Sequence, residues 1–204
     1  MATVTLARDT EIGGAVEVFF DYTCPFTYRA QGWLDGLADV EVMWRPFSLL
    51  EANYRGDGPS VWRRPDRADD ISLLLFAGHE LVRARGGDEA RYRRAVFHAW
   101  HGTHARLDLD AVARFAAEAG VAADEQAVRA HFLDAEAEHA AGAKLGVFGT
   151  PTLVYPDRAV AFVKLDTIPA PERARPLWQA TRELALHTGE LREWQRISPE
   201  EGAR

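Results

Sequence analysis

The chain contains 204 residues, of which 47% are hydrophobic, and its formal net charge is −7. That length and composition are enough to bury a full hydrophobic core. With a pI near 5.5 the chain offers no basic footprint, which argues against nucleic acid or an anionic membrane as a partner. The single cysteine, Cys24, excludes an intrachain disulfide and fits a reducing compartment.

Targeting signals and membrane spans are not recognisable in the sequence. The N-terminal segment lacks a basic and then apolar signal pattern, and no run of about 18 apolar residues occurs. We therefore expect a soluble, cytoplasmic protein without a membrane partner.

The first predicted unit is a strand, a helix and a second strand. Residues 15–22, AVEVFFDY, are short and mostly apolar, as in a strand covered on both faces. The segment CPFTYRAQGWLDGL has apolar residues at helical spacing, and Pro25 suits a first helical turn. A second β-rich run covers residues 40–49. This order predicts a βαβ unit with a parallel strand pair.

The middle of the chain is predicted to be helical. Residues 51–69 carry glycines and prolines and indicate a loop. Aspartates and glycines then mark helix starts and ends. The predicted helices are one capped by Asp70 and ended by Gly86 and Gly87, one over residues 89–100, one from Asp108 or Asp110 to Gly120, and one from Asp124 to Gly146.

The C-terminal part returns to strands. TPTLVYPDRAVAFVKL alternates apolar residues around a Pro-Asp-Arg turn, which predicts a hairpin, and a last helix is expected from about Pro176 to His187 after a turn that contains Pro171. The order β-α-β, helices, β-β-α predicts an α/β, thioredoxin-like fold with an inserted all-helical domain. We expect residues 15–50 and 143–190 to form the core, 66–142 the insertion and 191–204 a tail.

Cys24 is the first candidate for chemistry. Its predicted position at a helix N-terminus faces unpaired backbone N–H groups and the positive end of the helix dipole, which favour thiolate over thiol. Thr27 lies three residues further on, where its hydroxyl is placed to donate to the sulfur. Thr27 cannot form a disulfide.

The second candidate motif is GVFGTPT, residues 146–152. A Thr150–Pro151 bond that enters a strand from a tight turn is a plausible cis peptide. If Thr150 runs extended beside the cysteine helix, its backbone N–H and C=O can pair with an extended thiol peptide.

FDYTCPFTYRA, followed after a helical region by GVFGTPT, resembles the DsbA-like branch of the thioredoxin superfamily over residues 15–190. That branch holds DsbA oxidoreductases, FrnE-type proteins, mycothiol-dependent reductases, kappa-class glutathione transferases and 2-hydroxychromene-2-carboxylate isomerases. The resemblance implies a nucleophilic Cys24, a cis-proline at Pro151 and a backbone-pairing Thr150. The resulting site prediction is catalytic Cys24 and Thr27, with Pro25, Phe26, Thr150, Pro151 and Asp166 binding substrate or thiol and no metal.

The sequence departs from both halves of that branch. Dithiol members carry cysteine where Thr27 stands, whereas transferase and isomerase members commonly carry serine where Cys24 stands. The segment FVKLDTI keeps Phe162 and Asp166 but has lysine and threonine where that second half shows glycine and arginine. These differences weaken a glutathione-transferase assignment.

The leading hypothesis is a one-cysteine oxidoreductase whose Cys24 forms a mixed disulfide or adduct with a disulfide or electrophilic substrate. Glutathione, mycothiol or bacillithiol would then release it as an external thiol, with no tightly bound cofactor. The alternatives are a kappa-class transferase or isomerase-like enzyme and a non-catalytic thiol- or peptide-binding module. A monomer and a homodimer are both compatible with the sequence.

Three further features receive plainer interpretations. His98, His101 and His104 are interpreted as surface or pocket-lining residues rather than metal ligands, because steps of three turn the third histidine away from the first. Trp62 is expected to line a cleft between the layers. Asp21 is expected to be solvated, although it lies close to Cys24.

Overall fold

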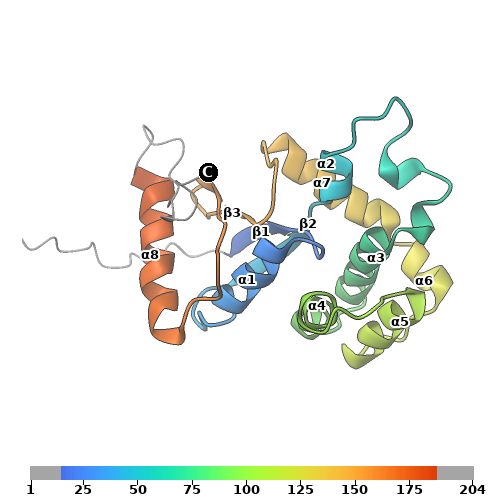
Figure 1. The fold of residues 1–204 in the computed structure, drawn as a ribbon, viewed down its shortest axis with the longest axis horizontal. Coiled ribbons are helices and arrows are strands. Elements are labelled where there is room, and N and C mark those ends of the chain that lie inside the picture. Colours follow the sequence, from blue (N-terminus) through green and yellow to red (C-terminus); the bar gives the residue numbers. More distant parts are fainter. Residues whose placement is uncertain (1–14, 188–204) are drawn as a thin grey trace, which may run out of the picture.

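The computed structural model describes residues 15–187, and the predicted tail, 191–204, lies outside them. Within that range the chain forms a four-stranded sheet with helices on both sides (Figure 1). The strands are β1 (Val16–Phe20), β2 (Val42–Pro46), β3 (Thr152–Val154) and β4 (Val160–Phe162). The helices are α1 (Pro25–Leu34), α2 (Leu49–Ala52), α3 (Ile71–Ala84), α4 (Glu89–Phe97), α5 (Leu109–Glu118), α6 (Glu125–Arg129), α7 (Phe132–Lys144) and α8 (Pro171–His187). Single turns of 3-10 helix cover Val61–Arg63 and Arg67–Asp69, and a π-helical turn covers His98–Gly102.

The sheet has the order β2-β1-β3-β4, with β1 and β2 parallel and the other pairs antiparallel. The predicted βαβ unit and hairpin are therefore present. On one face, Phe19 of β1 packs with Phe47 against Gly142 of α7, where a Cβ would come within 2.8 Å of the Phe19 ring. On the other face, Trp33 of α1 donates a hydrogen bond to the Ala174 carbonyl of α8 at 2.9 Å.

The chain leaves the sheet after β2, forms α2 to α7, and returns in β3. Helix α3 is the centre of this helical region, and almost all of its side chains are buried. Phe20 of β1 joins the region to the sheet, because its ring contacts Trp44, Phe76 and Phe97 at 5.7, 5.8 and 6.3 Å between centroids. One hydrophobic core therefore runs from the sheet into the helices.

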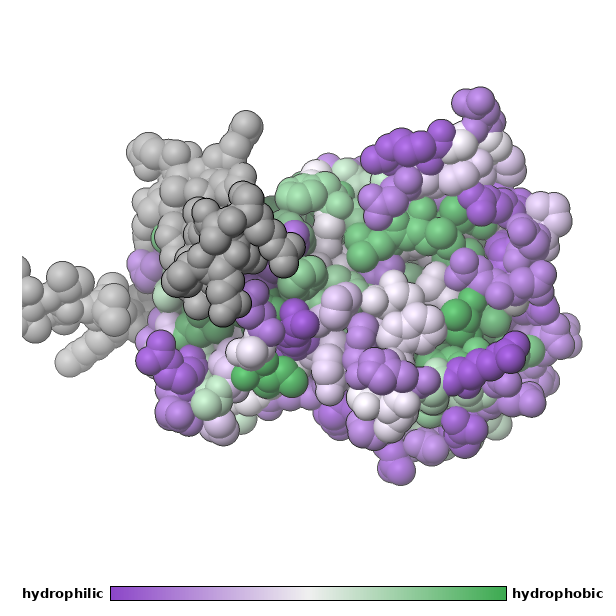
Figure 2. All heavy atoms as spheres, viewed as in Figure 1, coloured by the Kyte–Doolittle hydropathy of each residue, from purple (hydrophilic) through white to green (hydrophobic). Residues whose placement is uncertain are grey.

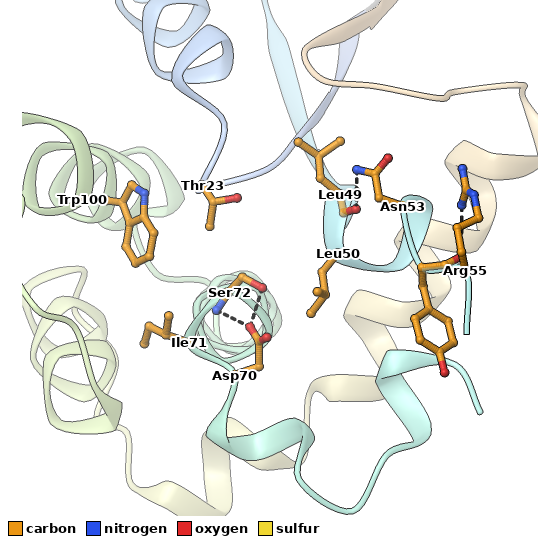
Figure 3. A pocket seen from close by; sticks show the side chains of 10 residues that line it. Thr23, Leu49, Leu50, Asn53, Arg55, Asp70, Ile71, Ser72 and Trp100 are labelled. Carbon is orange, nitrogen blue, oxygen red and sulfur yellow. Dashed lines mark hydrogen bonds between the residues drawn. The ribbon is translucent and has the colours of Figure 1, made fainter. Parts of the chain in front are cut away.

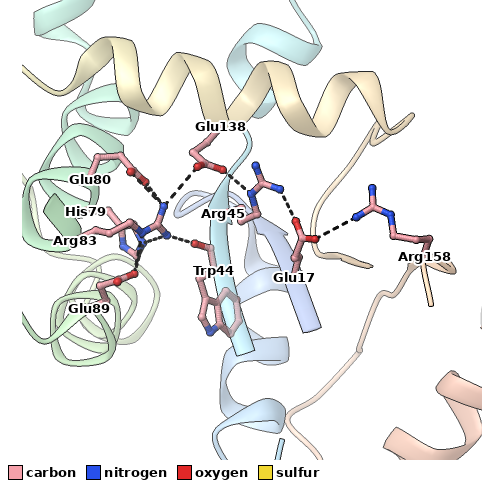
Figure 4. Close-up of polar contacts among 9 residues, drawn as sticks. All are labelled: Glu17, Trp44, Arg45, His79, Glu80, Arg83, Glu89, Glu138 and Arg158. Carbon is pink, nitrogen blue, oxygen red and sulfur yellow. Dashed lines mark hydrogen bonds and ion pairs between the residues drawn. The ribbon is translucent and has the colours of Figure 1, made fainter. Parts of the chain in front are cut away.

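A charged cluster also joins α3 to the sheet (Figure 4). Arg83 of α3 lies 2.9 Å from Glu80 and 3.2 Å from Glu89. It is 3.8 Å from Glu138 of α7. The other members are Glu17, Trp44 through its carbonyl oxygen, Arg45, His79 and Arg158.

Two predicted helices have different bounds. The helix expected from Asp124 to Gly146 is interrupted: α6 ends at Arg129, and α7 begins at Phe132 after His131, whose ring pairs with Asp134 at 2.6 Å. An aspartate cap marks where a helix begins, but it does not determine how far the helix continues.

The last helix begins at Pro171, so the turn expected before Pro176 is wrong. Pro171 occupies the first turn, where a missing N–H costs nothing, and Pro176 lies inside the helix. An interior proline costs about 3 kcal/mol. Burial of Ala174 and Trp178 against α1 offsets that cost, because Trp33 contacts both residues.

Trp62 does not line a cleft. Its side chain is only 2% exposed and packs 6.3 Å from the rings of Phe76 and His139. An indole in a proline-rich loop cannot be placed by sequence spacing, because the helices that cover it come from distant segments.

No helix within residues 15–187 combines the length and the apolar character that a membrane span needs.

Candidate active site

Cys24 ends the loop after β1 and is the N-cap of α1, with Pro25 in the first turn. Its backbone is extended, with φ −82° and ψ 117°, and the residue is 5% exposed. The Cys24 thiol donates a hydrogen bond to the Thr150 carbonyl oxygen at 3.2 Å. Cys24 is therefore almost fully covered, and a carbonyl 126 positions further along the chain accepts the hydrogen bond of its thiol.

The turn that contains Thr150 is fixed by the sheet. The Thr150–Pro151 bond is cis, and Thr152 pairs with Phe19 in the β1–β3 register. Val163 donates to the Pro151 carbonyl at 3.2 Å. Among the described residues, no acceptor takes the Thr150 N–H, so this donor remains available for a bound chain.

Two buried hydroxyls flank this arrangement in the sequence. Thr27 is fully buried and Thr150 is 2% exposed. Within residues 15–187 neither Oγ1 has a hydrogen-bond partner, so the bond expected from Thr27 to the Cys24 sulfur is not formed. A buried polar group without a partner costs about 1–3 kcal/mol and calls for an explanation.

The remaining predicted residues lie around the first turn of α1. Pro25 is exposed and Phe26 is half-buried. Asp166 is exposed and follows Leu165, whose carbonyl accepts a hydrogen bond from Arg29 of α1 at 3.0 Å. The structure thus joins Cys24 directly to Thr150, and places Asp166 in a segment that is tied to the same helix.

Asp21 is buried at 1% exposure, which corrects the expectation of a solvated carboxylate. One oxygen accepts from the N–H and hydroxyl of Thr23 at 2.8 and 2.7 Å, and the other accepts from the Leu49 N–H at 2.7 Å. Burial raises the pKa of Asp21, while these hydrogen bonds act in the opposite direction. Asp21 therefore fastens the cysteine loop to the start of α2.

An open groove of about 660 Å³ begins at Thr23, next to Cys24 (Figure 3). Asp70 caps α3 on its wall by accepting from the Ser72 N–H at 2.9 Å. The face drawn in Figure 2 carries apolar patches over the helical elements, separated by hydrophilic side chains. The groove is lined by Thr23, Leu49, Leu50, Asn53, Tyr54, Arg55, Asp70, Ile71, Ser72 and Trp100.

The π-helical turn brings His101 to the cysteine helix. Its ring stacks on Tyr28 at 5.1 Å, and its Nε2 donates to the Tyr22 carbonyl at 2.9 Å. Burial lowers the pKa of His101. His98 and His104 are exposed, and no group of three or more potential ligands is found in the described range. Unusual helical turns of this kind are frequent near functional sites.

Sequence reasoning did not identify the roles of Asp21 and His101. Asp21 had a usable signal, because a carboxylate three residues before a helix-capping cysteine lies in a tight strand-to-helix loop. His101 had none, since its contact with Tyr28 joins two segments more than 70 positions apart.

The fold and this cysteine site define a thioredoxin-like α/β protein with a helical region between its strands. A family model described as a DSBA-like thioredoxin domain matches residues 15–169, and the chain belongs to that family. No curated protein matches the chain.

Solved structures show the same fold. A probable DsbA oxidoreductase from Streptomyces coelicolor aligns with a TM-score of 0.58 and 18% identity, over 91% of this chain and 94% of that one. The cytosolic disulfide reductase DsbM from Pseudomonas aeruginosa, solved with GSH, aligns with a TM-score of 0.53 and 18% identity, over 84% of this chain and 100% of that one. A 2-hydroxychromene-2-carboxylate isomerase aligns with a TM-score of 0.55 and 19% identity, over 88% of this chain and 100% of that one.

Proposed function

We propose that the protein is a one-cysteine thiol–disulfide oxidoreductase with Cys24 as nucleophile. The observation that carries the proposal is the placement of the Cys24 thiol on the Thr150 carbonyl, beside the cis Pro151 and at the start of α1. Deprotonation of the thiol frees that carbonyl, which together with the Thr150 N–H then offers a backbone edge to a bound substrate.

The proposed reaction has two exchanges. The Cys24 thiolate attacks one sulfur of a disulfide, the old S–S bond breaks, and the second sulfur leaves as a thiolate. A low-molecular-weight thiolate, such as that of glutathione, mycothiol or bacillithiol, then attacks the substrate sulfur of the mixed disulfide. A new disulfide forms between these two sulfurs, the bond to Cys24 breaks, and Cys24 leaves as a thiolate. The outside thiol is needed because Cys24 is the only cysteine in the chain.

The binding site and setting complete the proposal. Pro25, Phe26 and Asp166 border the bound thiol, and the groove beside Thr23 holds the rest of the substrate. Residues 15–50 and 143–190 act as the thioredoxin-like core, of which 188–190 lie outside the described residues, and 66–142 act as the insertion. The protein works in the cytoplasm, as a monomer or homodimer, with no tightly bound cofactor.

The direct test compares wild type with Cys24→Ser in reduction of a small disulfide by each of the three thiols. Wild type is expected to turn over and to carry a thiol adduct on Cys24 by mass spectrometry, whereas Cys24→Ser shows neither. Full turnover by a folded Cys24→Ser variant would refute the proposal.

A second test adds the missing thiol. Thr27→Cys places a resolving cysteine three residues after Cys24, so a substrate bound as a mixed disulfide is expected to leave without added thiol. Thr27→Ser is the matched control and should retain its adduct until an external thiol is added. An adduct equally stable in both variants would show that residue 27 does not reach the sulfur.

The transferase or isomerase alternative is favoured by one observation, the apolar part of the groove formed by Leu49, Ile71 and Trp100. In that case an electrophilic substrate would be consumed with no net change in the redox state of the thiol pool. Measuring oxidised thiol after turnover separates the two reactions. A protein that binds thiols without any turnover would instead be a binding module.

A further inference from the structure

Lys164 is one of two lysines in the sequence, and it lies beside the cysteine site. Its ammonium nitrogen is 5.3 Å from the ring centroid of Phe26 and 5.1 Å from that of Phe162. The other lysine, Lys144, is exposed at the end of α7. Both lysines are exposed, but the Lys164 ammonium contacts two aromatic rings, which favours a position between them.

Both rings belong to the walls of the site. Phe26 stands in the first turn of α1, two residues after Cys24. Phe162 lies opposite Thr152 in the β3–β4 pair, and a Cβ on Gly149 would come within 3.1 Å of its ring. The Lys164 ammonium thus bridges the helix that carries the sulfur and β4, which pairs with the strand that follows the cis-proline turn.

The same rim exposes apolar surface. Phe148 is 71% exposed, although its ring meets Phe162 edge to face with 5.0 Å between centroids. A ligand attached to Cys24 can therefore place apolar atoms on these rings and a polar end near Lys164.

Lys164 and Arg29 are the cations at this rim, and Asp166 is the carboxylate that the proposed site places with them, in a chain of net charge −7. Within the described part of the chain, the Lys164 ammonium contacts the two rings and no carboxylate. Arg29 adds a second cation 5.4 Å from the Phe26 ring. An anion that arrives here gains Coulomb energy without displacing a protein carboxylate.

We propose that Lys164, held between Phe26 and Phe162, selects partners of Cys24 that carry a carboxylate close to the reacting sulfur. This inference rests on the proposed nucleophilic role of Cys24 and names the substrate class for it. Among the thiols considered above, glutathione and bacillithiol carry carboxylates and mycothiol does not. Lys164 is then a specificity residue, because it acts on the charge of the partner and not on the exchange itself.

The test uses three symmetrical disulfides of similar size: dithiodipropionate (anionic), hydroxyethyl disulfide (neutral) and cystamine (cationic). In each case the Cys24 thiolate attacks one sulfur and releases one thiolate, and mass spectrometry follows the mixed disulfide with time. Each rate is divided by the rate of the same reagent with 2-mercaptoethanol, because thiols of different pKa leave at different rates. On this scale we expect wild type to react about three- to tenfold faster with the anionic than with the neutral reagent, and slowest with cystamine. Salt should shrink these differences.

Lys164→Gln is expected to bring the three rates together, and Lys164→Glu to reverse their order. Lys144→Gln is the matched control and should keep the wild-type order. Equal rates in wild type, or a wild-type order in Lys164→Gln, would overturn the inference while leaving Cys24 as nucleophile. Failure of all three reagents to modify Cys24 would instead overturn the proposed function.

Discussion

The loop around Cys24 and the charged cluster around Arg83 are both polar and partly buried. They differ in whether their polar groups have hydrogen-bond or ion-pair partners. In the cluster each charge meets at least one opposite partner, as Arg83 does with Glu80 and Glu89. Beside Cys24, the Thr27 and Thr150 hydroxyls have no partner within residues 15–187. Paired charges hold two layers together, whereas the cysteine loop leaves two buried hydroxyls without a partner, which is more common at functional sites than elsewhere.

The largest expected effect concerns the cluster. Arg83→Met removes the guanidinium that faces Glu80 and the Trp44 carbonyl, and leaves Glu80 buried without its ion pair. Breaking a buried pair costs about 3–5 kcal/mol, and partial exposure of Arg83 reduces this to about 2 kcal/mol of unfolding free energy. Urea unfolding measures it, with exposed Arg91→Met as control. A loss of Cys24 reactivity in folded Arg83→Met would contradict a purely stabilising role for the cluster.

The next prediction concerns pH. Burial raises the pKa of Glu80 to about 7 and lowers that of His79 to about 4. Glu80 therefore reduces stability as pH rises from about 4.5 to 7, and His79 increases stability as pH rises from about 4 to 6.5, so the two nearly cancel. Glu80→Gln should leave the His79 contribution unopposed, so the free energy of unfolding should rise by about 2 kcal/mol between pH 4.5 and 6.5.

Unfolding measured at several pH values checks this, with exposed Glu118→Gln as the control for loss of one carboxylate. The same pH profile in wild type and Glu80→Gln would show that Glu80 does not titrate in this range.

A smaller effect on stability is expected at Asp21, which belongs to the cysteine loop but has hydrogen-bond partners for both carboxylate oxygens. Asp21→Asn keeps the shape but turns an N–H₂ group toward the Leu49 N–H, so two donors meet. We expect a loss of about 1–2 kcal/mol and slower adduct formation at Cys24, because the loop is no longer fastened to α2. Exposed Asp69→Asn is the control. Unchanged reactivity at lowered stability would limit Asp21 to a structural role.

The smallest change in stability is expected at Thr27. Thr27→Val removes a buried hydroxyl that has no partner, so stability should stay the same or rise by up to about 1 kcal/mol. If Thr27 acts on the sulfur during exchange, turnover falls about tenfold in Thr27→Val and is retained in Thr27→Ser. Calorimetry and the disulfide reduction assay measure the two quantities. Equal turnover in both variants would remove Thr27 from the catalytic set.

Local patterns predicted the parts of the fold that local physics controls. Alternation and apolar runs located the strands, and Asp70 and Asp108 cap their helices as expected because a side-chain oxygen satisfies a free N–H only at that position. Trp62 and the start of α8 were misplaced, since packing against distant segments overrides loop composition and proline cost.

The sequence by itself determined that one sulfur stands at a helix start, that no second cysteine can resolve its adducts, and that a Thr-Pro turn precedes a strand. These properties depend on residue order alone. Only the tertiary structure decided that the thiol donates to the Thr150 carbonyl, that Asp21 is buried, and that Lys164 lies between Phe26 and Phe162. Each of these depends on strand pairing and burial between segments that are far apart in the chain, which no local spacing encodes.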